Sequence, residues 1–288
     1  MRHIKRYTQL FENTQELTQE QRDWLDKCTR GSWKLNAETG LVDVRGDFKF
    51  GGKGLDSFNG VRFGTVSGTF YCNNNSLTSL EGAPQSVGEY FYCSNNSLTS
   101  LKGAPQRVSG GFYCSYNSLT SLEGAPQSVG DSFSCHNNSL TSLEGGPQSV
   151  GGYFDCSFNS LTSLEGAPQS VGGTFNCCRS SLTSLEGAPQ SVGGDFICHS
   201  NSLTSLEGAP QSVGADFACS DNPISERTIK GVLKRMSDSG ISLGQAVESY
   251  WRYIPKEDRP YLAKHHPNLS PVDKRGYEAL LKFRGKII

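Results

Sequence analysis

Residues 91–111 read FYCSNNSLTSLKGAPQRVSGG, and residues 112–132 repeat them closely as FYCSYNSLTSLEGAPQSVGDS. The same 21-residue unit recurs along the middle of the chain, where its cysteine stands at positions 72, 93, 114, 135, 156, 177, 198 and 219. A fixed period of roughly 20–50 residues is the signature of a solenoid, in which each unit packs on its neighbours. A unit this short accommodates one strand and a return segment but no pair of helices.

The strand of each unit is marked by alternation around the phenylalanine. In Phe91-Tyr92-Cys93 the first and third residues recur in every unit, whereas the middle one varies. Because successive side chains of a strand point to opposite faces, Phe and Cys are predicted to face the core, together with the recurring leucines and valine. Pro105 and the glycines after Val108 oppose a helix on the return path. The sequence therefore predicts a repeat solenoid with one short strand per unit and mostly non-helical return segments.

The unit also carries a family resemblance. The pattern Phe-x-Cys-x-x-Asn-x-Leu-x-x-Leu resembles the leucine-rich repeat, in the short form found in bacterial and bacteriophage proteins, over residues 46–223. The resemblance implies a horseshoe with the parallel sheet on its concave face. It also implies a ladder of asparagines that bond the backbone of adjacent turns. Ser180 interrupts this column, so its turn is expected to be the loosest. The ladder positions are Asn75, Asn96, Asn117, Asn138, Asn159, Asn201 and Asn222.

Three segments are expected. Residues 1–45 are predicted to form an N-terminal cap, with a helix from Thr18 to about Cys28 and a hairpin around residues 36–40. Residues 46–223 form the solenoid, with an irregular first unit in which Lys53 occupies the asparagine position. Residues 224–288 are predicted to form an α-helical C-terminal cap, because a solenoid end needs covering.

Charge limits the classes of partner. The 288 residues hold 27 Lys and Arg against 28 Asp and Glu, a net charge of -1. Residues 1–66, 67–222 and 223–288 carry +2, -9 and +6, which sum to the same value. The net charge of -1 removes the simplest reason to expect nucleic acid or a membrane surface as a partner. The basic end could contact an acidic partner or nucleic acid, but a solvated helix face is the favoured interpretation. With no apolar run long enough to span a bilayer and no secretory signal, a cytoplasmic protein with reduced thiols is expected.

The repeats differ from one another mainly at positions that should face outward from the strands. Tyrosine predominates in the N-terminal half of this variable face and aspartate in the C-terminal half, a composition typical of recognition surfaces. We therefore predict a non-enzymatic scaffold that binds a macromolecule, most of all a protein; a structural spacer or particle component is the alternative. The predicted binding residues are Tyr71, Tyr90, Tyr92, Tyr113, Tyr116, Tyr153, Phe158, Asp155, Asp195, Asp216 and Asp221.

Candidate catalytic and metal-binding residues give a weaker signal. Eight of the ten cysteines share one inward position without a paired histidine, which indicates inert buried thiols rather than a metal site. Cys178 is expected to face outward, and His199 follows one turn later, so a Cys–His nucleophile is a remote alternative. The glutamates at 81, 123, 144, 165, 186 and 207 offer too few oxygens for tight Ca²⁺ binding. No enzyme activity, cofactor or metal is predicted.

Overall fold

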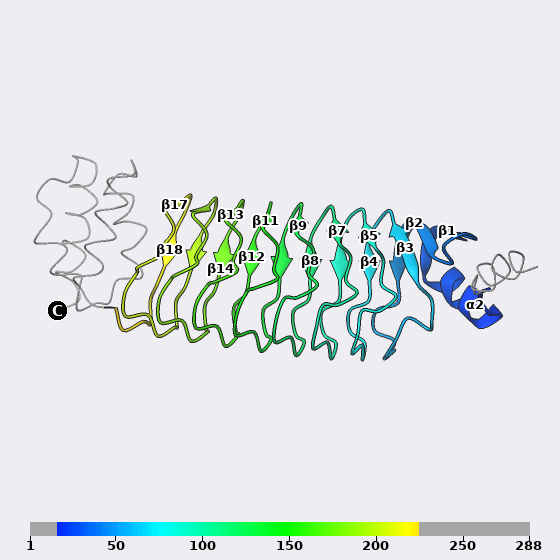
Figure 1. Cartoon of the computed structure of the whole chain (residues 1–288), viewed down its shortest axis with the longest axis horizontal. Helices are drawn as coiled ribbons and strands as arrows, with labels where there is room; N and C mark the ends of the chain where they lie inside the picture. The colour runs from blue at the N-terminus through cyan, green and yellow to red at the C-terminus, as the bar shows by residue number, and fades with distance from the viewer. Residues whose placement is uncertain (1–15, 225–288) are drawn as a thin grey trace, which may run out of the picture.

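The computed structural model describes residues 16–224 as a parallel β-solenoid with a helix and a hairpin at its N-terminal end (Figure 1). The C-terminal helices expected after residue 224 lie outside the described residues. No helix in the described part of the chain is long and apolar enough to span a bilayer.

Helix α2 (Gln19–Cys28) begins at the predicted capping box. Thr18 Oγ1 accepts from the Gln21 amide at 3.2 Å, and Gln21 Oε1 accepts from the Thr18 amide at 2.9 Å. The helix buries Leu25 and Cys28, and the Trp24 ring packs edge-on against the first core phenylalanine, Phe48, at 5.1 Å. The helix therefore covers the first turn of the solenoid.

The hairpin joins this cap to the repeats. Strand β1 (Thr29–Leu35) pairs antiparallel with β2 (Val42–Lys49). The other edge of β2 pairs parallel with β3 (Phe63–Val66) and then with β4 (Phe70–Tyr71). The antiparallel cap thus provides the edge from which the parallel stack grows, as the sequence predicts for the N-terminal end.

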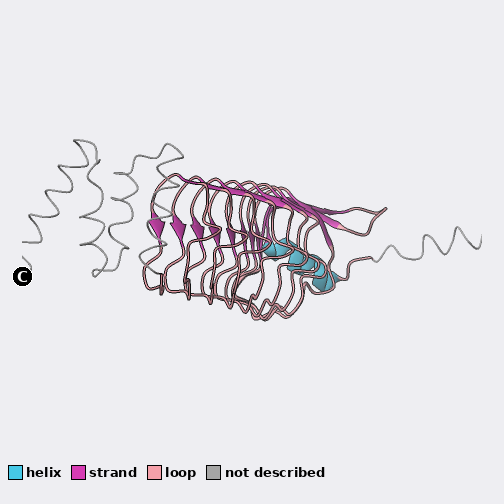
Figure 2. Ribbon diagram, turned by 60° about the vertical axis from the view of Figure 1, so that its left-hand side comes forward, coloured by secondary structure: helices cyan, strands magenta, loops and turns pink. Residues whose placement is uncertain are grey.

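The repeats contain two columns of short parallel strands rather than one (Figure 2). Each strand pairs with its equivalent 21 residues away, phenylalanine on phenylalanine or valine on valine. The phenylalanine column comprises β4, β6 (Phe91–Tyr92), β8 (Phe112–Tyr113), β10 (Phe133–Ser134), β12 (Phe154–Asp155), β14 (Phe175–Asn176), β16 (Phe196–Ile197) and β18 (Phe217–Ala218). The valine column comprises β3, β5 (Ser86–Val87), β7 (Arg107–Val108), β9 (Ser128–Val129), β11 (Ser149–Val150), β13 (Ser170–Val171), β15 (Ser191–Val192) and β17 (Ser212–Val213).

The core lies between these columns and the leucine-containing return. The repeat-unit phenylalanines, cysteines, leucines and valines from Val66 to Cys219 are at most 8% exposed, which confirms their inward assignment. The phenylalanine rings stack from turn to turn, with centroids 5.0–5.6 Å apart from Phe70 to Phe217. The cysteines are free thiols, and that of Cys72 donates to the Tyr92 carbonyl of the next turn at 3.2 Å.

The turns form a nearly straight stack rather than the pronounced horseshoe that the resemblance implies (Figures 1 and 2). The return segments also bond directly to their neighbours: the Ser97 amide donates to Leu77 O at 2.9 Å, and the Gln106 amide to Gln85 O at 3.1 Å. Curvature arises when the two sides of a turn repeat at different spacings. Here both sides repeat at the β-strand spacing of about 4.8 Å, so the stack has little reason to bend.

Candidate binding face

The strand face consists of the side chains that point away from the core on the phenylalanine column and on the two residues after each core cysteine. Tyr71, Tyr92 and Tyr113 form a ring stack along its N-terminal half. Their centroids are 5.2 and 4.7 Å apart, with interplanar angles of 6° and 9°. Lys49 Nζ lies 5.3 Å from the Tyr71 ring centroid and covers the end of the stack. The rings therefore cover one another and present their edges and hydroxyls.

Two further tyrosines close around this stack. Tyr90 lies 6.4 Å from Tyr113, and Tyr153, from two turns further along, lies 6.4 Å from Tyr113 on its other side. The Tyr113 ring folds over Gly111, where a Cβ would come within 2.8 Å of it. The Tyr113 and Tyr153 hydroxyls are hydrogen-bonded to each other, and burial raises the pKa of both. Five of the predicted binding residues are thus brought together.

Asp131 belongs to this group, although the sequence analysis missed it. Its Oδ2 accepts from the Tyr90 hydroxyl at 3.4 Å, and its Oδ1 accepts from Ser132 Oγ at 2.9 Å. A signal was present: the equivalent positions in the neighbouring turns are Gly110 and Gly152, so a carboxylate interrupts a column of glycines. We call Tyr90, Tyr92, Tyr113, Tyr153 and Asp131 the tyrosine–Asp131 cluster.

The residue before each repeat asparagine adopts a left-handed backbone conformation. Its φ is between 52° and 56° in every turn from Asn74 to Asp221. Asparagine tolerates this conformation best among residues with a side chain, and it occupies positions 74, 95 and 137. Tyr116 and Phe158 occupy the same position with 52% and 44% of their surface exposed. Two bulky aromatics are therefore held in a strained conformation without being buried.

Contacts extend from these two aromatics along the face. His136 lies edge-on to Tyr116, with ring centroids 5.1 Å apart. The Arg179 guanidinium lies 5.1 Å from the Phe158 ring centroid. With Tyr153 at 39% exposure, Tyr116 and Phe158 are the large exposed hydrophobic side chains of the described region.

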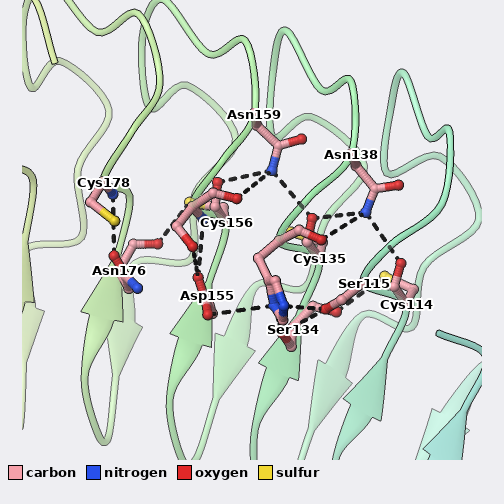
Figure 3. Close-up of polar contacts among 12 residues, drawn as sticks. Cys114, Ser115, Ser134, Cys135, Asn138, Asp155, Cys156, Asn159, Asn176 and Cys178 are labelled. Carbon is pink, nitrogen blue, oxygen red and sulfur yellow. Dashed lines mark hydrogen bonds and ion pairs between the residues drawn. The ribbon is translucent and has the colours of Figure 1, made fainter. Parts of the chain in front are cut away.

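The repeat asparagines bond the backbone within and between turns (Figure 3). Asn138 Nδ2 donates to Cys135 O of its own turn at 2.9 Å and to Cys114 O of the preceding turn at 3.2 Å. Its Oδ1 accepts from the Leu119 amide at 3.0 Å. Ser180 replaces asparagine in one turn, and its hydroxyl is a buried oxygen without a hydrogen-bond partner in residues 16–224.

Ser115, Ser134 and Asp155 (Figure 3) meet around the ring of His136. His136 Nδ1 lies 2.8 Å from the hydroxyls of both Ser115 and Ser134, and 3.5 Å from Asp155 Oδ2. A serine–histidine–aspartate relay needs the serine on one ring nitrogen and the carboxylate on the other. All three oxygens contact one nitrogen here, so this arrangement is a polar network and does not form that relay.

The expected exposure of Cys178 is wrong. Its side chain is only 5% exposed, because it packs between turns beside Ser157 and Asn176. Burial raises the pKa of its thiol, and the negative charge of Asp155 adds to the rise. His199 Nδ1 lies within hydrogen-bond distance of Ser200 Oγ, at 3.1 Å. A buried thiol with a raised pKa is a poor nucleophile, and the geometry lends no support to the Cys178–His199 alternative.

The predicted aspartates do not form one cluster. Asp155 bonds the Ser157 hydroxyl at 2.6 Å and faces His136, so it belongs to the polar network. Asp195 Oδ1 accepts from the Asp216 amide at 2.9 Å, and Asp221 Oδ2 accepts from Ser200 Oγ at 3.5 Å. In the described residues, no group of three His, Cys, Asp or Glu side chains is placed to hold a metal ion.

No protein-family model matches the chain, and no curated protein matches it. Among solved structures, YopM from Yersinia enterocolitica WA-314 matches with 21% sequence identity and a TM-score of 0.41. The match covers 57% of this chain and 42% of the YopM chain, so the chain spans less than half of that protein. The period, the buried columns and the paired parallel strands make the chain a leucine-rich-repeat-like solenoid.

Proposed function

We propose that the chain is a scaffold that binds another protein through its strand face. The observation that carries the proposal is the placement of Tyr116 and Phe158. Each has a left-handed backbone, which is unfavourable for a bulky side chain, and each leaves about half of its surface in water. Neither burial nor backbone preference accounts for these residues, whereas exposed aromatics are the usual anchors of protein interfaces.

The tyrosines of the same face support this role. Tyrosine offers a large rigid contact area and a hydroxyl that can both donate and accept a hydrogen bond, and it loses little conformational entropy on binding. The stack of Tyr71, Tyr92 and Tyr113 is already ordered by ring contacts before any partner arrives. A pre-ordered surface loses less free energy on association.

The alternative, a spacer whose strand face binds nothing, predicts that exposed residues are free to drift. Drift at a left-handed position should favour asparagine or glycine, because they fit the backbone. Asparagine does occupy positions 74, 95 and 137, and positions 179, 200 and 221 hold Arg, Ser and Asp, whereas positions 116 and 158 depart toward large exposed aromatics. The departure favours binding over the spacer.

The test uses a variant that should be more stable than the native chain. Tyr116→Asn with Phe158→Asn restores the residue that the repeat uses elsewhere, and we expect about 0.5–1 kcal/mol of stabilisation at each position from relief of backbone strain. Proteins captured by the immobilised native chain from extracts of its source organism should be lost with this variant. Urea denaturation measures the stability of both chains.

The matched control is Thr120→Ala with Thr162→Ala, which changes two exposed residues of the same turns on the return segment. This control should retain the captured proteins. Capture that is unchanged by the asparagine variant, or an absence of specific capture by the native chain, would favour the spacer.

A further inference from the structure

A carboxylate lies among the hydroxyls of the tyrosine–Asp131 cluster. Asp131 stands between β9 and β10, and the glycines at the equivalent positions of both adjacent turns, Gly110 and Gly152, leave it without neighbouring side chains in its column. Its two oxygens accept one hydroxyl each, from Tyr90 and Ser132. A carboxylate oxygen has two lone pairs, so each retains capacity for a further donor.

This carboxylate has no cationic partner in the part of the chain described. Within residues 16–224 the oppositely charged side chains in contact are Lys102 and Glu123, and His136 pairs with Asp155 only if its ring is protonated. Burial raises the pKa of Tyr113 and Tyr153, and the charge of Asp131 contributes to both shifts. The cluster is therefore a partly buried, electron-rich group whose negative charge is unbalanced.

The strand face supplies its own cations on either side of the cluster. Lys49 lies 5.3 Å from the ring of Tyr71 at the N-terminal end, and Arg179 lies 5.1 Å from the ring of Phe158 beyond it. Cation–aromatic contacts of this kind are favourable. The tyrosine–Asp131 cluster lies between these two contacts, and its rings and carboxylate have no lysine or arginine against them in the described residues. The surrounding segment, residues 67–222, has a net charge of -9.

We propose that the tyrosine–Asp131 cluster binds an arginine side chain of the protein partner. A guanidinium has five N–H donors in one plane, which suits an acceptor set made of a carboxylate and several hydroxyls. The Tyr90 hydroxyl donates to Asp131 within the cluster, so its oxygen keeps lone pairs for an incoming donor. A guanidinium is also less strongly hydrated than a lysine ammonium and stacks on aromatic rings.

This inference rests on the proposed function for the source of the arginine, but its test does not need the partner. The full chain, with its tyrosine rings isotopically labelled, is titrated with N-acetylarginine amide and followed by NMR. The ring signals of Tyr90, Tyr113 and Tyr153 should shift and saturate. Nα-acetylcitrulline amide, which has nearly the same shape but no charge, should bind at least about tenfold more weakly than the arginine compound. Nα-acetyllysine amide, which keeps a free side-chain ammonium, should also bind more weakly than the arginine compound.

Three variants localise the site. Asp131→Asn should weaken binding about tenfold or more, because it removes the charge and one acceptor. Tyr153→Phe, which keeps the ring and removes the hydroxyl, should weaken it about threefold. Glu123→Gln removes an equal charge from an exposed residue outside the cluster and should leave binding unchanged.

Equal affinity for Asp131→Asn and the native chain would overturn the proposal, as would equal binding of the citrulline compound or stronger binding of the lysine compound. These outcomes differ from failure of the proposed function. A native chain that binds the arginine compound but captures no protein would contradict only the assignment of the arginine to a protein partner.

Discussion

The repeats share one backbone conformation and differ at single positions, so the effect of a residue can be judged by comparing equivalent positions in neighbouring turns. Position 116 holds tyrosine where positions 95 and 137 hold asparagine, and all three have the same left-handed backbone. The recurrence of asparagine could have revealed this conformation from the sequence, because asparagine is the residue with a side chain that most often adopts it. The cost of an aromatic there became visible only with the backbone angles.

The turn that contains Ser180 gives a prediction at the residue scale. Ser180→Asn should raise the free energy of unfolding by about 1 kcal/mol or more, because the amide would supply bonds to Cys156 O and Cys177 O that serine is too short to make. Asn138→Ser should lower it by a similar amount, through loss of its bonds to Cys135 O and Cys114 O. Urea denaturation of both variants measures the change.

Hydrogen exchange provides the local check. In the native chain, exchange within the inner turns should be fastest near residues 175–185, and Ser180→Asn should slow it. If Ser180→Asn left both stability and exchange unchanged while Asn138→Ser lowered stability, the explanation by missing asparagine bonds would fail for that turn.

At the scale of the element, the column of cysteines couples the fold to pH. Burial raises the pKa of the thiols from Cys93 to Cys198 well above the usual 9.0, and that of Cys219 to about 12. In the unfolded chain these thiols ionise near pH 9, whereas in the folded chain they stay protonated. The stability that neutral thiols provide is thus complete below pH 9 and decreases as the pH rises above it.

Each buried thiol should lower the free energy of unfolding by up to about 1.4 kcal/mol per pH unit above pH 9. We therefore expect a steep loss of stability between pH 9 and pH 10, measured by urea denaturation at a series of pH values. Cys135→Ala should be less stable than the native chain at pH 7, yet its stability should fall less steeply, by the contribution of one proton. An identical slope in the two proteins would contradict the burial of that thiol.

The elements also show where sequence reasoning succeeds. An inward phenylalanine, cysteine or leucine is predictable because its environment recurs unchanged in every turn, so periodicity alone identifies it. The exposure of Cys178 was wrongly predicted because strand alternation indicates only that its side chain points away from the core. Whether it meets water depends on neighbours such as Ser157, the equivalent residue of the preceding turn, and Asn176 of its own turn, and both of these positions vary between turns.

At the scale of the whole stack, residues 16–224 form turns whose backbones bond to those of the adjacent turns. The candidate site depends on contacts that cross turns, such as Tyr113 with Tyr153 and Tyr90 with Asp131, which are two turns apart in each case. The sequence predicted that these tyrosines share a face. It could not show that they converge on one carboxylate, because side-chain direction within a face is set by space, here the space left by Gly111.

A deletion tests whether the turn is the unit of the stack. Removing residues 118–138 takes out one complete 21-residue repeat and joins Asn117 to Ser139 in the existing frame. This variant should fold cooperatively with a lower free energy of unfolding, because one turn and one interface are lost. Removing only residues 118–128 should destabilise the chain more, although fewer residues are lost, because the remaining half-turn cannot continue either strand column.

Circular dichroism and urea denaturation compare the two deletions. A half-turn deletion more stable than the whole-turn deletion would mean that the return segments tolerate changes of length, and that the bonds seen between them contribute little.

The direct bonding of each return segment to the next affects how the gene for such a chain can evolve. Because every turn presents the same pair of complementary edges, gain or loss of one whole repeat at the DNA level leaves each remaining residue in its place relative to the core. Nearly identical neighbouring repeats are also the substrate on which unequal recombination acts. A gene of this kind can change the length of the strand face in a single event, while point substitutions at positions such as 116 and 158 change the side chains that this face presents.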